Sequence, residues 1–231
     1  MSSRVLVIDF ETANTSATSA CAIGAILIED DVITEKYYSL IKPPSSVFQF
    51  TYIHGVTWDD VKDAPTFKEL WDKDFGKLYE SATLIVGHNI QFDTRVLKAT
   101  AEHHLVDLPH RPTECTVKLA RNQLEIKPAK LDNVCRTLKI PLEHHQALSD
   151  SLASAYIYLY AKTGEKPWLT GTPITRQYEL ITDDDVPIAI APRKKKTPKN
   201  LEETISTLNS DESKAKLAAL LSKMAVSTKS D

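Results

Sequence analysis

Two acidic residues, Asp9 and Glu11, directly follow the apolar run Val5–Ile8. Such a run is typical of a buried strand, and side chains two residues apart on a strand point to the same face. Adjacent carboxylates repel each other unless a proton or a cation lies between them, and Mg²⁺ binds hard, charged oxygens. The pair therefore indicates a metal site. The alternative is a strand that leaves the core with its acids in water.

A third acid, Asp93, closes the segment Gly87–Asp93, which follows a second apolar run, Thr83–Val86. The glycine, histidine and asparagine that open this segment predict a turn between a buried strand and a helix. Asp93 would then lie in the first turn of that helix, where the helix dipole also favours an acid with a purely structural role. Asn89 either caps the helix or contacts a substrate.

A pair of histidines opens the next segment, His144–Asp150. Asp150 is expected to begin a helix and His145 to lie in the loop before it, which places an imidazole and a carboxylate on one rim. Histidine has an unperturbed pKa of about 6.5 and can accept a proton at neutral pH. The alternative is a solvated loop histidine beside a helix N-cap acid.

The combination of these residues is more specific than any one of them. Four carboxylates and one histidine are expected to converge from strand ends and helix starts. Two divalent cations about 3.5–4 Å apart can hold the attacking and leaving oxygens of a phosphodiester, while a histidine takes the proton of the attacking water. The residues therefore predict a two-metal phosphodiester hydrolase, whereas a purely structural protein would leave the convergence of acids unexplained.

Hydrophobic periodicity predicts the elements that must position these residues. Helices are expected after Thr66, after Asn89, from Leu131 and from Leu148. The expected strands are Val5–Ile8, Ala22–Ile28, Thr34–Ile41, Thr83–Val86 and Glu114–Thr116. Three strands in a meander, followed by alternating strands and helices, predict an α/β fold. Its mixed central sheet would have three antiparallel strands and then parallel strands, flanked by helices.

The composition of the 231 residues is ordinary, with 42% hydrophobic residues, 26% charged residues and a net charge of −3. This charge excludes a protein that is basic throughout, although a local basic groove can coexist with an acidic metal site. Three widely spaced cysteines argue against a disulfide framework or a zinc site. No apolar run approaches the ~18–20 residues of a membrane span. A cytoplasmic protein without membrane contact is expected.

The motifs, taken together, resemble those of the DEDDh group of 3′→5′ exonucleases, a DnaQ-like branch of the ribonuclease H-like superfamily. They occur in the family's order as Asp9–Thr12, Gly87–Asp93 and His145–Asp150. The segment Ile53–Thr57 also resembles a family stretch near the substrate nucleotide. Within the group, the segment Cys115–Arg121 and the histidine pair are most similar to exodeoxyribonuclease X.

This resemblance implies hydrolysis of DNA from the 3′ end to 5′-mononucleotides, with two Mg²⁺ ions for which Mn²⁺ can substitute. Single-stranded 3′ ends should enter most easily. Position by position, it implies that His145 is the general base, because only His145 stands five residues before Asp150. The implied metal ligands are Asp9, Glu11, Asp93 and Asp150, and the implied nucleotide-binding residues are Thr12, His54, Asn89 and Phe92.

The resemblance predicts an exonuclease domain at residues 1–165. A proline-rich, charged linker or extension is expected at 166–209, and a helix with a tail at 210–231. The extension is a candidate contact for a DNA polymerase or a repair partner, with a solvated linker as the alternative. Two other functions stay open: an RNA 3′→5′ exonuclease of the same superfamily, which would differ in its contact with the 2′-OH, and a non-catalytic module that binds nucleic acid or a polymerase.

Overall fold

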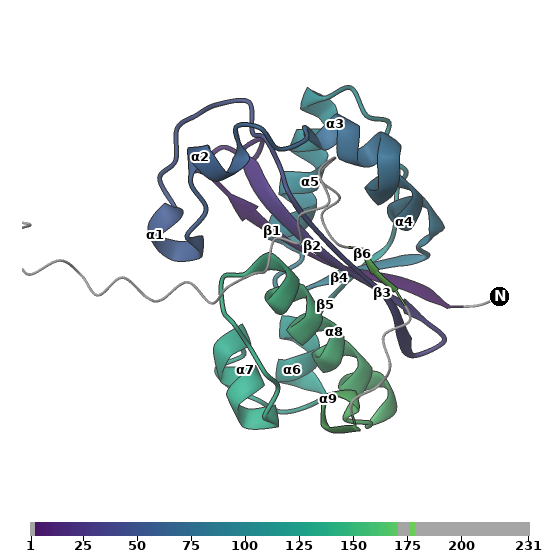
Figure 1. Cartoon of the computed structure of the whole chain (residues 1–231). Helices are drawn as coiled ribbons and strands as arrows, with labels where there is room; N and C mark the ends of the chain where they lie inside the picture. Colours follow the sequence, from purple (N-terminus) through teal and green to yellow (C-terminus); the bar gives the residue numbers. More distant parts are fainter. Residues whose placement is uncertain (1–2, 171–175, 179–231) are drawn as a thin grey trace, which may run out of the picture. The chain divides into compact units, whose positions relative to one another are not determined.

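The structure, a computed structural model, describes residues 3–170 and 176–178. Its strands form a mixed sheet in the order β5-β4-β1-β2-β3-β6 (Figure 1). β1–β2 and β2–β3 are antiparallel, whereas β1–β4, β4–β5 and β3–β6 are parallel, so the predicted fold class is confirmed. The strands are β1 (Arg4–Thr12), β2 (Ala20–Glu29), β3 (Val32–Leu40), β4 (Leu84–Gly87), β5 (Thr113–Cys115) and β6 (Arg176–Tyr178).

Helices cover both faces of this sheet, with α3, α4 and α5 on one face and α6, α7 and α8 on the other (Figure 1). A π-helical turn, Trp71–Phe75, joins α3 to α4. The helices are α1 (Thr51–His54), α2 (Trp58–Val61), α3 (Phe67–Leu70), α4 (Gly76–Ser81), α5 (Gln91–His103), α6 (Thr116–Asn122), α7 (Leu131–Leu138), α8 (Ala147–Thr163) and α9 (Pro167–Thr170).

The alternation of side chains along β1 decides what each face of the sheet buries. Leu6 belongs to the apolar cluster that includes residues of α3, α4 and α5. Val5 and Val7 point the other way, into a second cluster with residues of α8. Asp9 and Glu11 continue the series of Val5 and Val7, so their carboxylates are on the face of the sheet that α8 covers.

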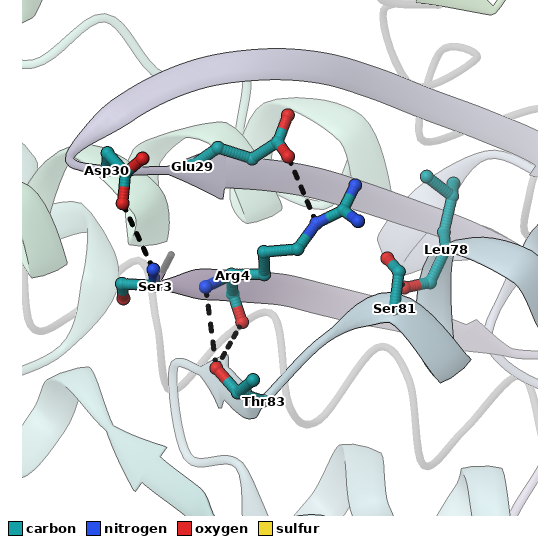
Figure 2. A network of polar contacts seen from close by, with 7 residues as sticks. All are labelled: Ser3, Arg4, Glu29, Asp30, Leu78, Ser81 and Thr83. Carbon is teal, nitrogen blue, oxygen red and sulfur yellow. Dashed lines mark hydrogen bonds and ion pairs between the residues drawn. The ribbon is translucent and has the colours of Figure 1, made fainter. Parts of the chain in front are cut away.

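Polar contacts fix the start of β1 between its two neighbours (Figure 2). The Ser3 N–H donates to Asp30 Oδ1 at 3.0 Å, and Arg4 Nε forms an ion pair with Glu29 Oε1 at 3.0 Å. On the other side, the Thr83 hydroxyl donates to the Arg4 carbonyl at 2.9 Å. This ion pair is only partly buried, and a surface ion pair contributes only about 0–1 kcal/mol to stability. We therefore regard these contacts as setting the register of β1, and with it the position of the acids at its far end.

A glycine lets α8 begin close against the sheet. Gly24 pairs with Asp9 in the β1–β2 ladder. A Cβ atom at Gly24 would lie 2.1 Å from the carbonyl oxygen of Ala147, the first residue of α8. Since no side chain fits in that space, the glycine is required for α8 to start here and for Asp150, one turn later, to reach Asp9.

The predicted helix starts are mostly confirmed, and Thr66 caps the helix expected after it. The Glu69 carboxylate accepts from the Thr66 N–H at 2.7 Å, and the Thr66 hydroxyl accepts from the Glu69 N–H, which completes a capping box. Helix α6 was not predicted. Its seven residues follow β5 without a break, and so short a helix shows too few turns for a recognisable apolar stripe.

The chain beyond residue 165 contains two short elements where the sequence predicts a linker or extension. Helix α9 follows α8 closely, and β6 pairs in parallel with Glu35–Tyr37 of β3. The rest of the predicted extension, and the predicted helix at 210–231, lie outside the described residues. Within the described residues, no helix combines the length and the apolar character needed to cross a bilayer.

Candidate active site

The predicted metal ligands converge in one cavity of about 690 Å³. Carboxylate oxygens of Asp9, Glu11 and Asp150 lie within 4.8 Å of one another. Asp93 lines the same cavity and is buried, and its Oδ1 accepts the N–H of Phe10 at 3.0 Å. Acids from β1, α5 and α8, far apart in the sequence, thus meet at one end of the sheet.

The turn after β4 delivers Asp93 to this cavity. Asn89 has a left-handed backbone with φ of 69°, a conformation that asparagine tolerates better than most residues, and α5 begins two residues later. The N-cap position is Ile90, and no side chain caps the helix. The capping role considered for Asn89 is therefore wrong. Its exposed side chain lines the cavity instead.

His145 stands beside the acids in an unusual backbone conformation. Its φ of 67° is left-handed, and its N–H donates to Asp150 Oδ2 at 3.0 Å. The rings of His144 and His145 stack at 3.9 Å between centroids, and both line the cavity. Burial, followed by the charge of His144, lowers the pKa of His145 below its usual value of 6.5. A neutral imidazole that can accept a proton is therefore available near pH 7.

The acids are electrostatically strained in the absence of a counter-charge. Burial, reinforced by the neighbouring carboxylates, raises the pKa of Asp9 well above its usual range and that of Glu11 to about 8. Burial likewise raises the pKa of Asp93 to about 7 and that of Asp150 to about 6. Asp150 Oδ1 is buried without a hydrogen-bond partner. An all-oxygen donor set with an unsatisfied buried oxygen fits a hard divalent cation such as Mg²⁺.

The raised pKa values predict that the metal-free protein loses stability as pH rises. These carboxyls titrate near 3.8 to 4.5 when unfolded and between about 6 and 8 in Asp150, Asp93 and Glu11 when folded. Because the folded state then binds more protons than the unfolded state, the free energy of unfolding should fall between about pH 5 and pH 8. Melting temperatures measured in a chelator across this range would show the decline.

Saturating Mg²⁺ should flatten that decline, because a cation replaces the protons between the carboxylates. Glu80→Gln controls for a general effect of removing an acid, because Glu80 is an exposed acid of α4 that does not line the cavity. It should keep the pH dependence. A melting temperature in chelator that rises from pH 5 to pH 8 would contradict the electrostatic picture.

The predicted nucleotide-binding residues divide into two groups. Asn89 and Phe92 line the cavity, whereas Thr12 and His54 do not. His54 Nδ1 accepts from the Val56 N–H at 3.1 Å, so its Nε2 carries the proton and donates to the Thr12 carbonyl at 3.1 Å. This contact ties α1 to the end of β1. A direct contact of Thr12 or His54 with a nucleotide stays a prediction.

Several other residues that line the cavity were not singled out from the sequence. Among them are His88, which was noted only as part of the turn, and three basic residues, Arg121, Lys127 and Lys130. The recurrence of basic residues between positions 118 and 130 is a signal that could have drawn attention to them. The position of the basic residues in the same cavity as the acids depends on α6 and on the loop that follows it.

Comparison with known proteins connects this site to a family. The chain matches the RNase_T exonuclease family over residues 6–158. It is 32% identical to the DNA polymerase III subunit epsilon of Rickettsia prowazekii, over 70% of this chain and 74% of that protein. It is 31% identical to the PolC-type DNA polymerase III of Thermotoga petrophila, over 67% of this chain. It spans only 11% of the length of that polymerase.

Solved structures agree with this relationship. One is exonuclease X in complex with 5′ overhanging duplex DNA, with a TM-score of 0.54, 25% identity and coverage of 70% of this chain and 93% of that one. Another is an Escherichia coli ExoI–ssDNA complex, with a TM-score of 0.61 over 73% of this chain and 42% of that one. Its 18% identity supports the fold alone. With the family match extending from β1 into α8, the chain belongs to the RNase_T exonuclease family, in its DEDDh group with a ribonuclease H-like fold.

Proposed function

We propose that this protein is a metal-dependent 3′→5′ exonuclease that hydrolyses DNA from its 3′ end to 5′-mononucleotides. The observation that carries the proposal is the meeting of Asp9, Glu11 and Asp150 within 4.8 Å, in a cavity that also contains Asp93 and His145. A non-catalytic binding module would have no use for a neutral histidine beside unsatisfied carboxylates. Family membership supports the same reading.

In the mechanism we propose, Asp9, Glu11, Asp93 and Asp150 hold two divalent cations, Mg²⁺ by preference with Mn²⁺ as a substitute. These cations, when bound, would lower the pKa of the attacking water and would offset the charge on the leaving oxygen. His145 takes a proton from the water as its oxygen attacks the terminal phosphorus. The bond from phosphorus to the 3′ oxygen breaks, and the departing oxygen takes a proton from solvent, which releases a 5′-mononucleotide and a shortened strand with a new 3′-OH.

Two backbone hydrogen bonds position the proposed general base and one of the proposed metal ligands. The backbone N–H of His145 donates to Asp150, so the base is attached to the same carboxylate that we propose as a metal ligand. The backbone N–H of Phe10 fixes Asp93 in the same way. Holding both groups on rigid elements supports catalysis by fixing their orientation before the substrate arrives.

DNA is the proposed substrate because the relatives bear the names of DNA polymerases and exonuclease X was solved with DNA. Single-stranded 3′ ends are the proposed form, since the terminal nucleotide must leave a duplex to enter the cavity. The names of the relatives also support a proposed role in proofreading or repair in the cytoplasm, beside a DNA polymerase. RNA is the competing substrate, because the acids and the histidine do not distinguish the two sugars.

The proposal predicts a ladder of products from a DNA strand labelled at its 5′ end. With Mg²⁺, the labelled strand should shorten one nucleotide at a time from the 3′ end, because each cycle releases one 5′-mononucleotide. Gel electrophoresis of samples taken over time would reveal the ladder. Chelation of the metal should stop it.

An RNA strand of the same sequence is the matched substrate control, and Asp9→Asn is the matched protein control. A ladder on RNA alone would keep the mechanism and replace the substrate. A ladder that persists in Asp9→Asn would point to a contaminating nuclease. No ladder on either strand with Mg²⁺ or Mn²⁺ would overturn the catalytic proposal in favour of a binding module.

A further inference from the structure

Basic residues from positions 121–130 line the active-site cavity together with its acids, and the exposed Asp132 follows them in the lining. Arg121 at the end of α6, Lys127 in the following loop and Lys130 before α7 all line the cavity with exposed side chains. We call these three residues the basic wall. None of them forms an ion pair with a residue in the described part of the chain. Their charges are therefore available to an anionic ligand.

The loop that carries the two lysines is held by apolar residues that alternate with them. Ile126, Ala129 and Leu131 are buried in the cluster with α7 and α8, while Lys127 and Lys130 stay exposed. This alternation anchors the backbone of the loop, and both lysines line the cavity. The charges are thus presented by an anchored segment, which reduces the entropy lost when they bind a ligand.

His88 ties this loop to the turn beside the acids. Its Nε2 lies 3.0 Å from the carbonyl oxygen of Ala129, which can only accept, so Nε2 carries the proton. Its Nδ1 must then accept, and the Thr116 hydroxyl donates to it at 2.8 Å. A single half-buried ring therefore joins the turn after β4, the start of α6 and the lysine loop.

We propose that the basic wall binds the phosphates of the DNA strand upstream of the scissile bond, and that His88 is the positioning residue that holds the wall. The inference rests on the proposed function, because the acids define where the 3′-terminal phosphate lies. A strand whose 3′ end lies at the acids must leave the cavity, and the wall supplies positively charged side chains along that path. Phosphates are the anions that such a strand offers at regular intervals.

The test compares full-length Lys127→Ala/Lys130→Ala with a matched control, Lys73→Ala/Lys77→Ala. The control removes two exposed lysines from the opposite face of the sheet, so the net charge changes equally. Binding is measured by fluorescence anisotropy with a single DNA strand of about ten nucleotides over a range of salt concentrations, in chelator to prevent hydrolysis. The wall variant should bind about tenfold more weakly, with a salt slope shallower by about 1.4 for two lost phosphate contacts. The control should match the wild type.

Substrate length separates phosphate binding from a general structural defect. In steady-state hydrolysis, the wall variant should raise KM for the long strand while leaving kcat near the wild-type value. A dinucleotide has no upstream phosphate, so its kinetics should not change. An equal loss on both substrates would overturn the inference.

His88 is tested by the same length comparison. His88→Ala should raise KM for the long strand more than for the dinucleotide, because the loop loses its anchor. His88→Gln keeps an N–H that can reach the Ala129 carbonyl and should restore much of the affinity. If glutamine rescues nothing while alanine lowers kcat on both substrates, His88 does not act through the wall.

The outcomes separate this inference from the proposed function. A wild-type protein that binds DNA through the wall but hydrolyses nothing would overturn the exonuclease proposal and support the wall. A wild-type protein that hydrolyses DNA, with the wall variant unchanged in affinity and salt slope, would overturn the wall alone. A wild-type protein that neither binds nor hydrolyses DNA would overturn both.

Discussion

Glu11→Gln should lower the rate of DNA hydrolysis by about 10³-fold or more while making the metal-free protein more stable near pH 8. The loss follows because a bound cation provides several kcal/mol of transition-state stabilisation, and each ~1.4 kcal/mol corresponds to a factor of ten. The gain follows because burial and the neighbouring acids raise the pKa of Glu11 to about 8, so its ionised form destabilises the folded state. Single-turnover hydrolysis with Mg²⁺ and thermal melting in chelator measure the two effects.

Glu11 is the clearest position for this experiment because no described hydrogen bond depends on its side chain. Asp93 and Asp150 each accept a buried or half-buried backbone N–H, at 3.0 Å in both cases. Alanine at either position should also abolish turnover. It would add the cost of an unsatisfied N–H, about 1–3 kcal/mol, and obscure the electrostatic gain.

The opposite signs of the two effects make the prediction easy to contradict. If Glu11 served only the fold, its replacement would lower the stability of the protein in chelator as well as with Mg²⁺. Near-normal hydrolysis by Glu11→Gln would remove this residue from the metal site. Added Mg²⁺ should stabilise the wild type more than the variant, since a ligand that binds only the folded state raises its stability by an amount that increases with the logarithm of its affinity.

The convergence of the acids could be predicted because it depends on local rules. Alternation along a strand places Asp9 and Glu11 on one face, and the apolar runs before Asp93 and around Asp150 locate their elements. The ends of these elements then meet at one edge of the sheet. The structure adds why α8 can approach so closely, which is the absence of a side chain at Gly24.

Other features depend on tertiary contacts and could not be predicted. The left-handed conformations of Asn89 and His145 orient both residues, yet neither residue type requires φ near 70°. Strand β6 is three residues long, and its pairing is decided by the edge that β3 offers. A prediction of the basic wall would have required the path of the loop after α6, and hydrophobic periodicity does not reveal that path.

His145→Ala should slow hydrolysis by about 10²–10⁴-fold with little change in KM, as expected for the loss of a general base. The structure supports this because burial and His144 lower the pKa of His145, so the imidazole is neutral and can accept a proton near pH 7. The acid limb of the wild-type rate profile should therefore lie below the usual histidine pKa of about 6.5. That limb should change in the variant. Single-turnover rates across pH provide the measurement.

His144→Ala is the matched control, since it removes the neighbouring imidazole of the stacked pair and leaves the N–H contact of His145 with Asp150 in place. It should lower the rate much less than His145→Ala. Mg²⁺ should still stabilise both variants, because neither histidine is needed to hold the cations in the proposed site. If His144→Ala were the slower enzyme, the base would be His144. The left-handed backbone at His145 would then serve to present its neighbour to the cavity.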